Sequence, residues 1–304
     1  MRATTLLLAT AALFGANVSA LTRRETTNAF TNFVDQFLSP NNAKVAASVN
    51  STLFAEDVTG TVDVSTNFDG RELSTEYLFG LFVNVGQDER PSPIGVPLSY
   101  NVTSLAVQNN YVFASIKFDF YYHSLNLHYP VQIDLWLLFN EQKEVQQYDV
   151  AFRRWAWATD NLAPLILPQM AKYANITDTT DPAQILTRYT APIICGAHQL
   201  YCKGDNQQYT DYADCMAQVG KKPLGTFYRM GEDNILCRSL HVHMLPLRPS
   251  VHCPHIGPTG GGMCVSRNYT EVVLADHFPK GFIAPKCVKP KNLYGPRGNG
   301  NSTA

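Results

Sequence analysis

All seven cysteines of this 304-residue chain lie between residues 195 and 287, and their placement divides the chain into two parts that must fold by different means. Residues 25–155 contain no cysteine, so their stability has to come from the burial of apolar side chains. Residues 191–288 are rich in cysteine, proline and glycine, which is typical of a small module held by disulfides. The cysteines are Cys195, Cys202, Cys215, Cys237, Cys253, Cys264 and Cys287.

An odd number of cysteines leaves one without an intrachain partner. Cys287 lies beyond the dense cluster in a stretch rich in Pro and Lys, and we expect it to be the unpaired residue. The other six are expected to form disulfides, and the sequence does not choose among their possible pairings.

The N-terminal residues predict export. Arg2 gives a basic start, residues 6–14 form an apolar stretch too short to span a bilayer, and Val18-Ser19-Ala20 is a small-residue cleavage signal. We therefore predict that residues 1–20 are a signal peptide, that no later segment spans a membrane, and that the mature protein is extracellular. Residues 289–304 are expected to form a disordered tail.

The charge and the glycosylation signals agree with the predicted extracellular location. The chain carries 24 Lys and Arg residues against 25 Asp and Glu, so it offers no basic field for a nucleic-acid backbone. Nucleic acid is therefore not an expected partner. Five Asn-x-Ser/Thr sites predict glycosylation at exposed positions. They are Asn50, Asn101, Asn175, Asn268 and Asn301.

The cysteine-free part begins with helical patterns and continues with strands. Apolar residues at i, i+3, i+4 and i+7 predict a helix around Phe30–Leu38, and similar spacing predicts helices over 42–54 and 72–85. A strand is expected over 58–64. Alternating patterns then predict four longer strands, which cover residues 98–107, 111–122, 131–139 and 145–152.

The third of these strands shows how the sheet should be buried. Val131, Ile133 and Leu135 fall on one face, whereas Asp134 and Trp136 fall on the other. The first face is expected to pack on the helices, and charged residues of the second face are expected to pair across strands. Trp136 suggests that the second face is covered by the cysteine-rich part or by a twin chain.

This order of elements resembles the NTF2-like (SnoaL-like) cone. The matching pieces are the helix around Phe30–Leu38, the entry Phe54-Ala55-Glu56-Asp57-Val58 and the strand Gln147-Tyr148-Asp149-Val150. The resemblance implies an α+β fold over residues 25–155, with helices packed on a curved antiparallel sheet. A helical connector over 156–190 would join it to the module. The family includes isomerases, cyclases and dehydratases as well as non-catalytic binding and dimerisation modules, so the fold alone does not fix an activity.

The second part resembles a cysteine-rich module of uncharacterised secreted fungal proteins, and this resemblance implies no activity. It rests on four pieces of sequence. They are Tyr201-Cys202-x-Gly204-x-Asn206-Gln207-Gln208-Tyr209, Cys237-Arg238-x-Leu240-His241, Arg248-Pro249-x-x-His252-Cys253-Pro254-His255-Ile256-Gly257 and Gly260-Gly261-Gly262-x-Cys264.

Half of the eight histidines fall within residues 241–255, which makes this stretch a candidate metal site. They are His241, His243, His252 and His255. Two histidines two residues apart on a helix point about 200° apart, so His241 and His243 cannot both bind one ion unless the helix has ended. A three-histidine site would use one of them with His252 and His255. The competing interpretation is that these histidines are packed among disulfides and hydrogen-bonded to backbone carbonyls.

Inside the cone the candidate polar residues are Asp57, Tyr77, His123, His128 and Asp149. A cyclase or dehydratase would need a carboxylate that orients an imidazole, and no such pair is identified by spacing. His123 and His128 flank a strand turn and are expected to be exposed. The sequence also lacks a Gly-x-Ser-x-Gly nucleophile motif.

Together these patterns predict a secreted binding or interaction protein. Its cone would hold a small apolar or aromatic ligand or would form a homodimer through the sheet face, and no cofactor is the favoured expectation. The alternative is an extracellular enzyme, either an acid–base catalyst of SnoaL-like type or a transition-metal site at the 241–255 histidines.

Overall fold

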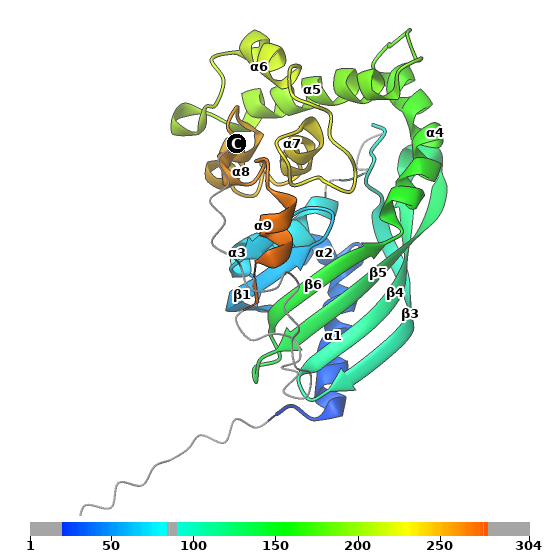
Figure 1. The fold of residues 1–304 in the computed structure, drawn as a ribbon, viewed down its shortest axis with the longest axis vertical. Helices are drawn as coiled ribbons and strands as arrows, with labels where there is room; N and C mark the ends of the chain where they lie inside the picture. Colours follow the sequence, from blue (N-terminus) through cyan, green and yellow to red (C-terminus); the bar gives the residue numbers. More distant parts are fainter. Residues whose placement is uncertain (1–19, 84, 86–89, 276, 279–304) are drawn as a thin grey trace, which may run out of the picture.

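The computed structural model describes residues 20–83, 85, 90–275, 277 and 278 (Figure 1). The N-terminal part contains α1 (Arg23–Phe37), α2 (Asn41–Ser48), β1 (Phe54–Val62), β2 (Asn67–Asp69), α3 (Arg71–Leu78), β3 (Val96–Gln108), β4 (Tyr111–Tyr122), β5 (Leu127–Phe139) and β6 (Val145–Arg153). The C-terminal part contains α4 (Trp155–Tyr173), α5 (Pro182–Tyr201), α6 (Tyr212–Val219), α7 (Ile235–Val242), α8 (Pro249–Ile256) and α9 (Tyr269–Leu274).

The six strands form one sheet in the order β2-β1-β6-β5-β4-β3. All neighbours are antiparallel except β1 and β6, which are parallel. The four long strands make a broad twisted sheet with α1 across one face, and α3 lies against β1 and β2 (Figure 1). The fold class is therefore the predicted one, an α+β cone followed by a disulfide-linked helical module. The arrangement is the one that the NTF2-like resemblance implies.

The predicted burial of the sheet is confirmed. Val131, Ile133 and Leu135 are buried against the helices, whereas Trp136 is 48% exposed. Aromatic side chains dominate the space between sheet and helices, and the ring of Phe33 packs edge-on against both Phe54 and Phe79. The core of the cone is thus built without a disulfide, as the absence of cysteines from this part requires.

Most of the described module packs over the end of the cone where α3 lies (Figure 1), and Trp136 on the outer face of the sheet stays half-exposed. His277 of the module reaches the sheet edge, where its Nε2 lies 3.5 Å from Oδ1 of Asp69. The expected cross-strand charge pairing is present, because Arg153 Nε lies 3.0 Å from Asp134 Oδ2. Whether a twin chain covers this face stays a prediction.

Several predicted boundaries shift for local reasons. The second helix ends at Ser48 rather than residue 54, because Val49 adopts a φ of 58° and the chain then enters β1 at Phe54. The short β2 was not predicted. The helix expected over 72–85 ends at Leu78 and is followed by a 3₁₀ turn, Gly80–Phe82. Helix α5 runs past residue 190, where the connector is expected to end, and continues to Tyr201.

Three disulfides confirm the pairing of the six clustered cysteines. The bonds are Cys195–Cys215, Cys202–Cys253 and Cys237–Cys264. They run through a second buried cluster that α5, α6, α7 and α8 share. Cys287, the predicted signal peptide up to residue 19, Asn301 and the tail 289–304 lie outside the described residues.

The module is not a separate body beside the cone. Met244 is fully buried in the core cluster of the cone, and Met230 and Leu247 pack against the same cluster. The backbone N–H of Met230 also donates to the carbonyl of Val64, 2.8 Å away. Figure 1 shows α7 and α8 above α3 at the end of the cone. This contact brings the histidines of the module against the N-terminal part.

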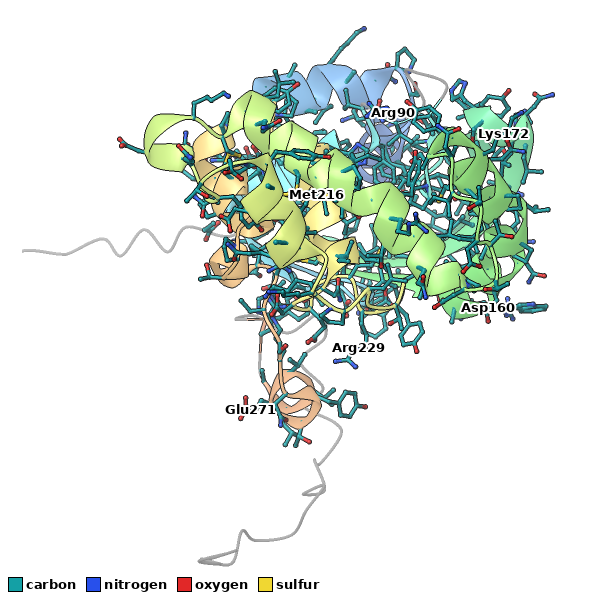
Figure 2. The ribbon with its side chains drawn as sticks, turned by 90° about the horizontal axis from the view of Figure 1, so that it is seen from above. Arg90, Asp160, Lys172, Met216, Arg229 and Glu271 are labelled. Carbon is teal, nitrogen blue, oxygen red and sulfur yellow. A yellow bond between two sulfur atoms is a disulfide. The ribbon has the colours of Figure 1, made fainter. Side chains whose placement is uncertain are left out.

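Helix α9 stands apart from this arrangement. Tyr269, Val272, Val273 and Leu274 are all exposed on it, and Figure 2 shows Glu271 on a helix that projects from the body. None of the described helices combines the length and the apolar character that a bilayer crossing needs.

We expect Gly60→Ala to destabilise the cone. A Cβ at Gly60 would lie 1.8 Å from Cζ of Tyr148, the fully buried ring that faces Gly60 across β1 and β6. Relief of this overlap should lower the free energy of unfolding by about 1–3 kcal/mol, measured by urea denaturation. Gly196→Ala in α5 is the matched control, because its Cβ meets nothing within 4 Å. The control should be neutral or slightly stabilising, and equal losses in the two variants would contradict the prediction.

We also expect His198 to make stability fall in mild acid. His198 is buried, and its Nε2 accepts the backbone N–H of Gln208 at 2.9 Å and that of Tyr209 at 3.3 Å. Burial, followed by the charge of Lys203, lowers the pKa of His198. In mild acid the unfolded chain therefore binds a proton at His198, whereas the folded chain does not. The free energy of unfolding falls as the pH drops below about 6.5. His198→Gln should flatten the pH dependence of unfolding between pH 7 and 5, and an unchanged slope would argue against it.

Candidate metal centre

Two adjacent residues of α3 carry the N-terminal half of the candidate site. The helix begins after Gly70, whose φ of 89° suits glycine, and it packs on β1. The ring of Tyr148 in β6 packs across Gly60 of β1, and its hydroxyl lies 3.2 Å from Oγ of Ser74 in α3. This contact holds α3 against the sheet. The next turn of α3 then presents Glu76 and Tyr77 to the module, and both side chains are buried.

The other half of the site comes from α7 and α8. Asn234 caps α7 by accepting the backbone N–H of Cys237 at 2.7 Å, and this helix carries His241. Pro249 occupies the first turn of α8, which carries His252 and His255. These two are three residues apart on the helix and therefore share a face.

The three histidines converge through the same ring nitrogen. Nδ1 of His241 lies 3.4 Å from Nδ1 of His252 and 3.2 Å from Nδ1 of His255. The hydroxyl oxygen of Tyr77 lies 3.1 Å from Nδ1 of His241 and 3.5 Å from Nδ1 of His255. Four polar atoms from three helices thus meet at one point inside the protein.

A buried carboxylate stands behind this group. Oε2 of Glu76 lies 3.1 Å from Nε2 of His252, on the side of the ring that faces away from the other histidines. The guanidinium of Arg248 binds the same carboxylate with Nε at 2.7 Å and Nη2 at 2.5 Å, and its Nη1 also contacts Glu72. The Glu76 and His252 side chains have no exposed surface.

The electrostatics of the group favour neutral imidazoles beside a charged carboxylate. Burial lowers the pKa of His241 well below its ordinary value, and burial together with the neighbouring His252 lowers the pKa of His255 to about 4. Burial alone would raise the pKa of Glu76, but the contacts with His252 and Arg248 outweigh it and the pKa is lowered. At neutral pH His241 and His255 therefore offer imidazole lone pairs near the charged carboxylate of Glu76.

Arg238 sets the separation of α7 and α8. Its guanidinium is fully buried and donates to the carbonyl oxygens of Asn234, Gly257 and Pro258 at 3.0–3.3 Å. Asp233 neutralises it at 2.7 Å. Because Gly257 and Pro258 follow α8 directly, this network holds the end of α8 against the start of α7. The disulfides Cys202–Cys253 and Cys237–Cys264 anchor the same two helices.

An apolar cavity lies on the cone side of Tyr77. It measures about 100 Å³, and a second cavity of about 60 Å³ adjoins it. The two share lining from Leu81, Phe82, Phe152, Met230 and Leu240. The ring of Tyr77 lines the first cavity and stacks on Phe68 with ring centroids 4.0 Å apart. Tyr77 therefore separates the apolar cavity from the polar cluster.

The structure brings together some of the residues selected from the sequence. His241, His252, His255 and Tyr77 meet as described, whereas His243 ends α7 and is not among the converging residues. This agrees with the argument that neighbours two apart on a helix cannot share an ion. Cys237 and Cys264 lie close to His241, but both sulfurs are in a disulfide and cannot serve as thiolate ligands.

The other candidates of the cone do not form a site. Asp57 and His123 are exposed, and Asp149 lies opposite Trp136 on the outer face of the sheet. Burial and the charge of Asp63 raise the pKa of Asp149. His128 contacts Asp119 at 2.8 Å, but 62% of the His128 side chain is exposed. None of these residues lines the apolar cavity.

Sequence reasoning missed Glu76, Arg248 and Arg238. Glu72 and Glu76 are one turn apart on α3, which signals a shared acidic face, but nothing in the sequence identifies Arg248 as their partner 172 residues away. Four of the predicted glycosylation positions, Asn50, Asn101, Asn175 and Asn268, are exposed as expected. Their modification stays a prediction.

Comparison with protein families assigns both parts of the chain to one family. Residues 31–150 match the model of the BfoA N-terminal domain, and residues 154–267 match that of the BfoA family C-terminal domain. Aurasperone B biosynthesis cluster protein A of Aspergillus niger is 39% identical over 83% of this chain and 81% of that protein. Bifonsecin B biosynthesis cluster protein A of Aspergillus brasiliensis is 39% identical over 83% of this chain and 84% of that protein.

Similarity to solved structures is much weaker. A de novo designed protein with a curved β-sheet has a TM-score of 0.32 and 13% identity, and it covers 48% of this chain and 99% of its own. A proposed ketosteroid isomerase from Kribbella flavida has a TM-score of 0.31 and 15% identity, and it covers 42% of this chain and 78% of its own. At this level the likeness says nothing about activity.

Glu76 and Glu72 both contact Arg248, one buried and one exposed, and they provide a matched test of the buried charge. Glu76→Gln leaves Arg248 without its buried partner and should lower the free energy of unfolding by about 3–5 kcal/mol. Glu72→Gln, at a side chain that is 52% exposed, should cost less than about 1 kcal/mol. Urea denaturation at pH 7 measures both. If the two losses were equal, the buried ion pair would not be what joins α3 to α8.

Proposed function

The chain belongs to the BfoA family, and from this premise we propose that it is an exported binding protein for a small aromatic molecule. The ligand would occupy the apolar cavity between the sheet and the helices of the cone. The observation that carries the proposal is the lining of this cavity, which is almost wholly apolar and combines aliphatic with aromatic side chains. It includes Phe33, Phe37, Phe68, Tyr77, Phe82, Phe118 and Phe152.

An aromatic lining favours a flat, apolar ligand. Offset and edge-on ring contacts stabilise such a molecule beyond the burial of its surface. The edge-on contacts of Phe37 with Phe82 and Phe118 already line the cavity with ring edges and faces. The first cavity is about the size of one small ring, and a larger ligand would extend into the second by displacing the shared side chains.

The names of the relatives support a ligand from secondary metabolism. The two Aspergillus relatives are named for the biosynthesis clusters of aurasperone B and bifonsecin B. A binding protein in such a cluster would hold an intermediate or a product. The three disulfides and the N-terminal export signal support action in an oxidising compartment.

Binding is better supported than acid–base catalysis in the cone. Among the described residues that line the two cavities there is no Asp, Glu or His. The hydroxyl of Tyr77 is directed to the histidines rather than into the cavity, and burial raises its pKa well above the ordinary value. No carboxylate or imidazole of the described lining is therefore placed to exchange a proton with a bound molecule.

Isothermal titration calorimetry with 2-naphthol, aurasperone B and bifonsecin B tests the proposal. Leu81→Trp fills space at the junction of the two cavities, and Leu81 is only partly buried, so the larger ring can be accommodated at the rim. We expect it to weaken binding at least 10-fold. Leu105→Trp, on an exposed position of β3, is the control and should bind as the unchanged protein does.

Circular dichroism establishes that both variants are folded. If the unchanged protein bound none of the three compounds, or if folded Leu81→Trp bound them with unchanged affinity, the cavity would not be the ligand site.

A further inference from the structure

We infer that His241, His252 and His255 form a site for a divalent transition-metal ion of the zinc type. The ion would join α7 and α8 of the module, beside Glu76 and Tyr77 of α3. This inference goes beyond the binding of a small molecule in the cone, and it does not depend on that proposal.

The spacing of the histidine nitrogens carries the inference. With metal–nitrogen bonds of about 2.0–2.1 Å, the corners of a tetrahedron lie about 3.3–3.4 Å apart. The Nδ1–Nδ1 separations of His241 from His252 and His255 are 3.4 and 3.2 Å, which match that value. The Tyr77 hydroxyl lies 3.1 Å from Nδ1 and 3.4 Å from Nε2 of His241, so it stands beside the ring and is not one of the ligands.

A carboxylate stands behind the site at ion-pair distance. Oε2 of Glu76 lies 3.1 Å from Nε2 of His252, although the two are not aligned as a hydrogen bond. A proton on Nε2 leaves the lone pair on Nδ1 for the ion. Arg248 holds the carboxylate from the opposite side. Carboxylate–histidine pairs of this kind orient the ring and increase its basicity as a ligand.

The chemistry of the donors selects the class of ion. Three imidazoles suit Zn²⁺ and its neighbours in the transition series, whereas Mg²⁺ and Ca²⁺ prefer carboxylate and carbonyl oxygen. The three histidines are at most 7% exposed. Three protein ligands leave a fourth position for water or another small ligand.

The fold gives such an ion a clear mechanical role. His241 lies on α7, and His252 and His255 lie on α8. One ion would tie these two helices together next to the buried ion pair between Glu76 and Arg248, which joins the module to the cone.

Zinc reconstitution of the full-length secreted protein tests the inference. The protein is treated with a chelator, dialysed against Zn²⁺, freed of loose metal by gel filtration and analysed by inductively coupled plasma mass spectrometry. We expect about one equivalent of zinc, an increase in Tm on loading, and the visible bands of tetrahedral Co²⁺ when cobalt replaces zinc. A folded protein that takes up less than a tenth of an equivalent and shows no such bands overturns the inference in favour of a packed histidine cluster.

Matched histidine variants locate the ion. His255→Gln removes one corner and should lower the bound metal below a tenth of an equivalent. His243→Gln, at the end of α7 but outside the cluster, should keep one equivalent. Full zinc in His255→Gln would overturn the assignment. If His255→Gln does not fold, the Zn²⁺ content and Co²⁺ spectrum of the unchanged protein decide the question alone.

Two further variants test the residues of α3 beside the ion. Tyr77→Phe removes no ligand and should keep about one equivalent of zinc. Glu76→Gln should weaken metal binding about 10- to 100-fold without loss of a direct ligand. Loss of zinc from folded Tyr77→Phe would overturn the three-histidine assignment, and unchanged affinity in Glu76→Gln would remove the carboxylate from the site.

Discussion

The ion pair between Glu76 and Arg248 is the contact on which the junction of the two parts depends. A carboxylate without exposed surface is costly to bury unless it is fully paired, and Glu76 is paired by a guanidinium on one side and an imidazole on the other. Both partners come from the module. The cone alone would therefore leave a buried charge unpaired, so the N-terminal domain and the disulfide-linked helices stabilise each other and are best regarded as one folding unit.

Tyr77 lies between the apolar cavity of the cone and the polar histidine cluster of the module. One side of its ring faces an apolar cavity lined by phenylalanine, and its hydroxyl reaches the histidine cluster. An aromatic ring with a polar tip is the side chain suited to such a position. The arrangement allows an apolar ligand in the cone and a polar centre in the module to lie side by side, with neither exposed to the polarity of the other.

Local pattern predicted the parts of this structure but not their junction. The alternation of Val131, Ile133 and Leu135 identified the buried face of the sheet, and the spacing of His241 and His243 indicated that only one of them could join His252 and His255. The convergence of His241 with His252 and His255 was weighed in advance as one of several arrangements. Glu76 was not foreseen, because its partners follow more than 170 residues later and no local period records a contact of that range.

The short distances between the ring nitrogens of the histidine cluster, near 3.3 Å, require rigid surroundings, because small shifts of α7 or α8 would change them. Arg238 supplies part of this rigidity by tying the carbonyl oxygens at the start of α7 to those after α8, and the disulfides at Cys237 and Cys253 fix the same helices covalently. On the other side, Gly60 allows Tyr148 to hold α3 through Ser74. A residue without a side chain and a buried arginine thus determine the geometry of a site that neither of them touches.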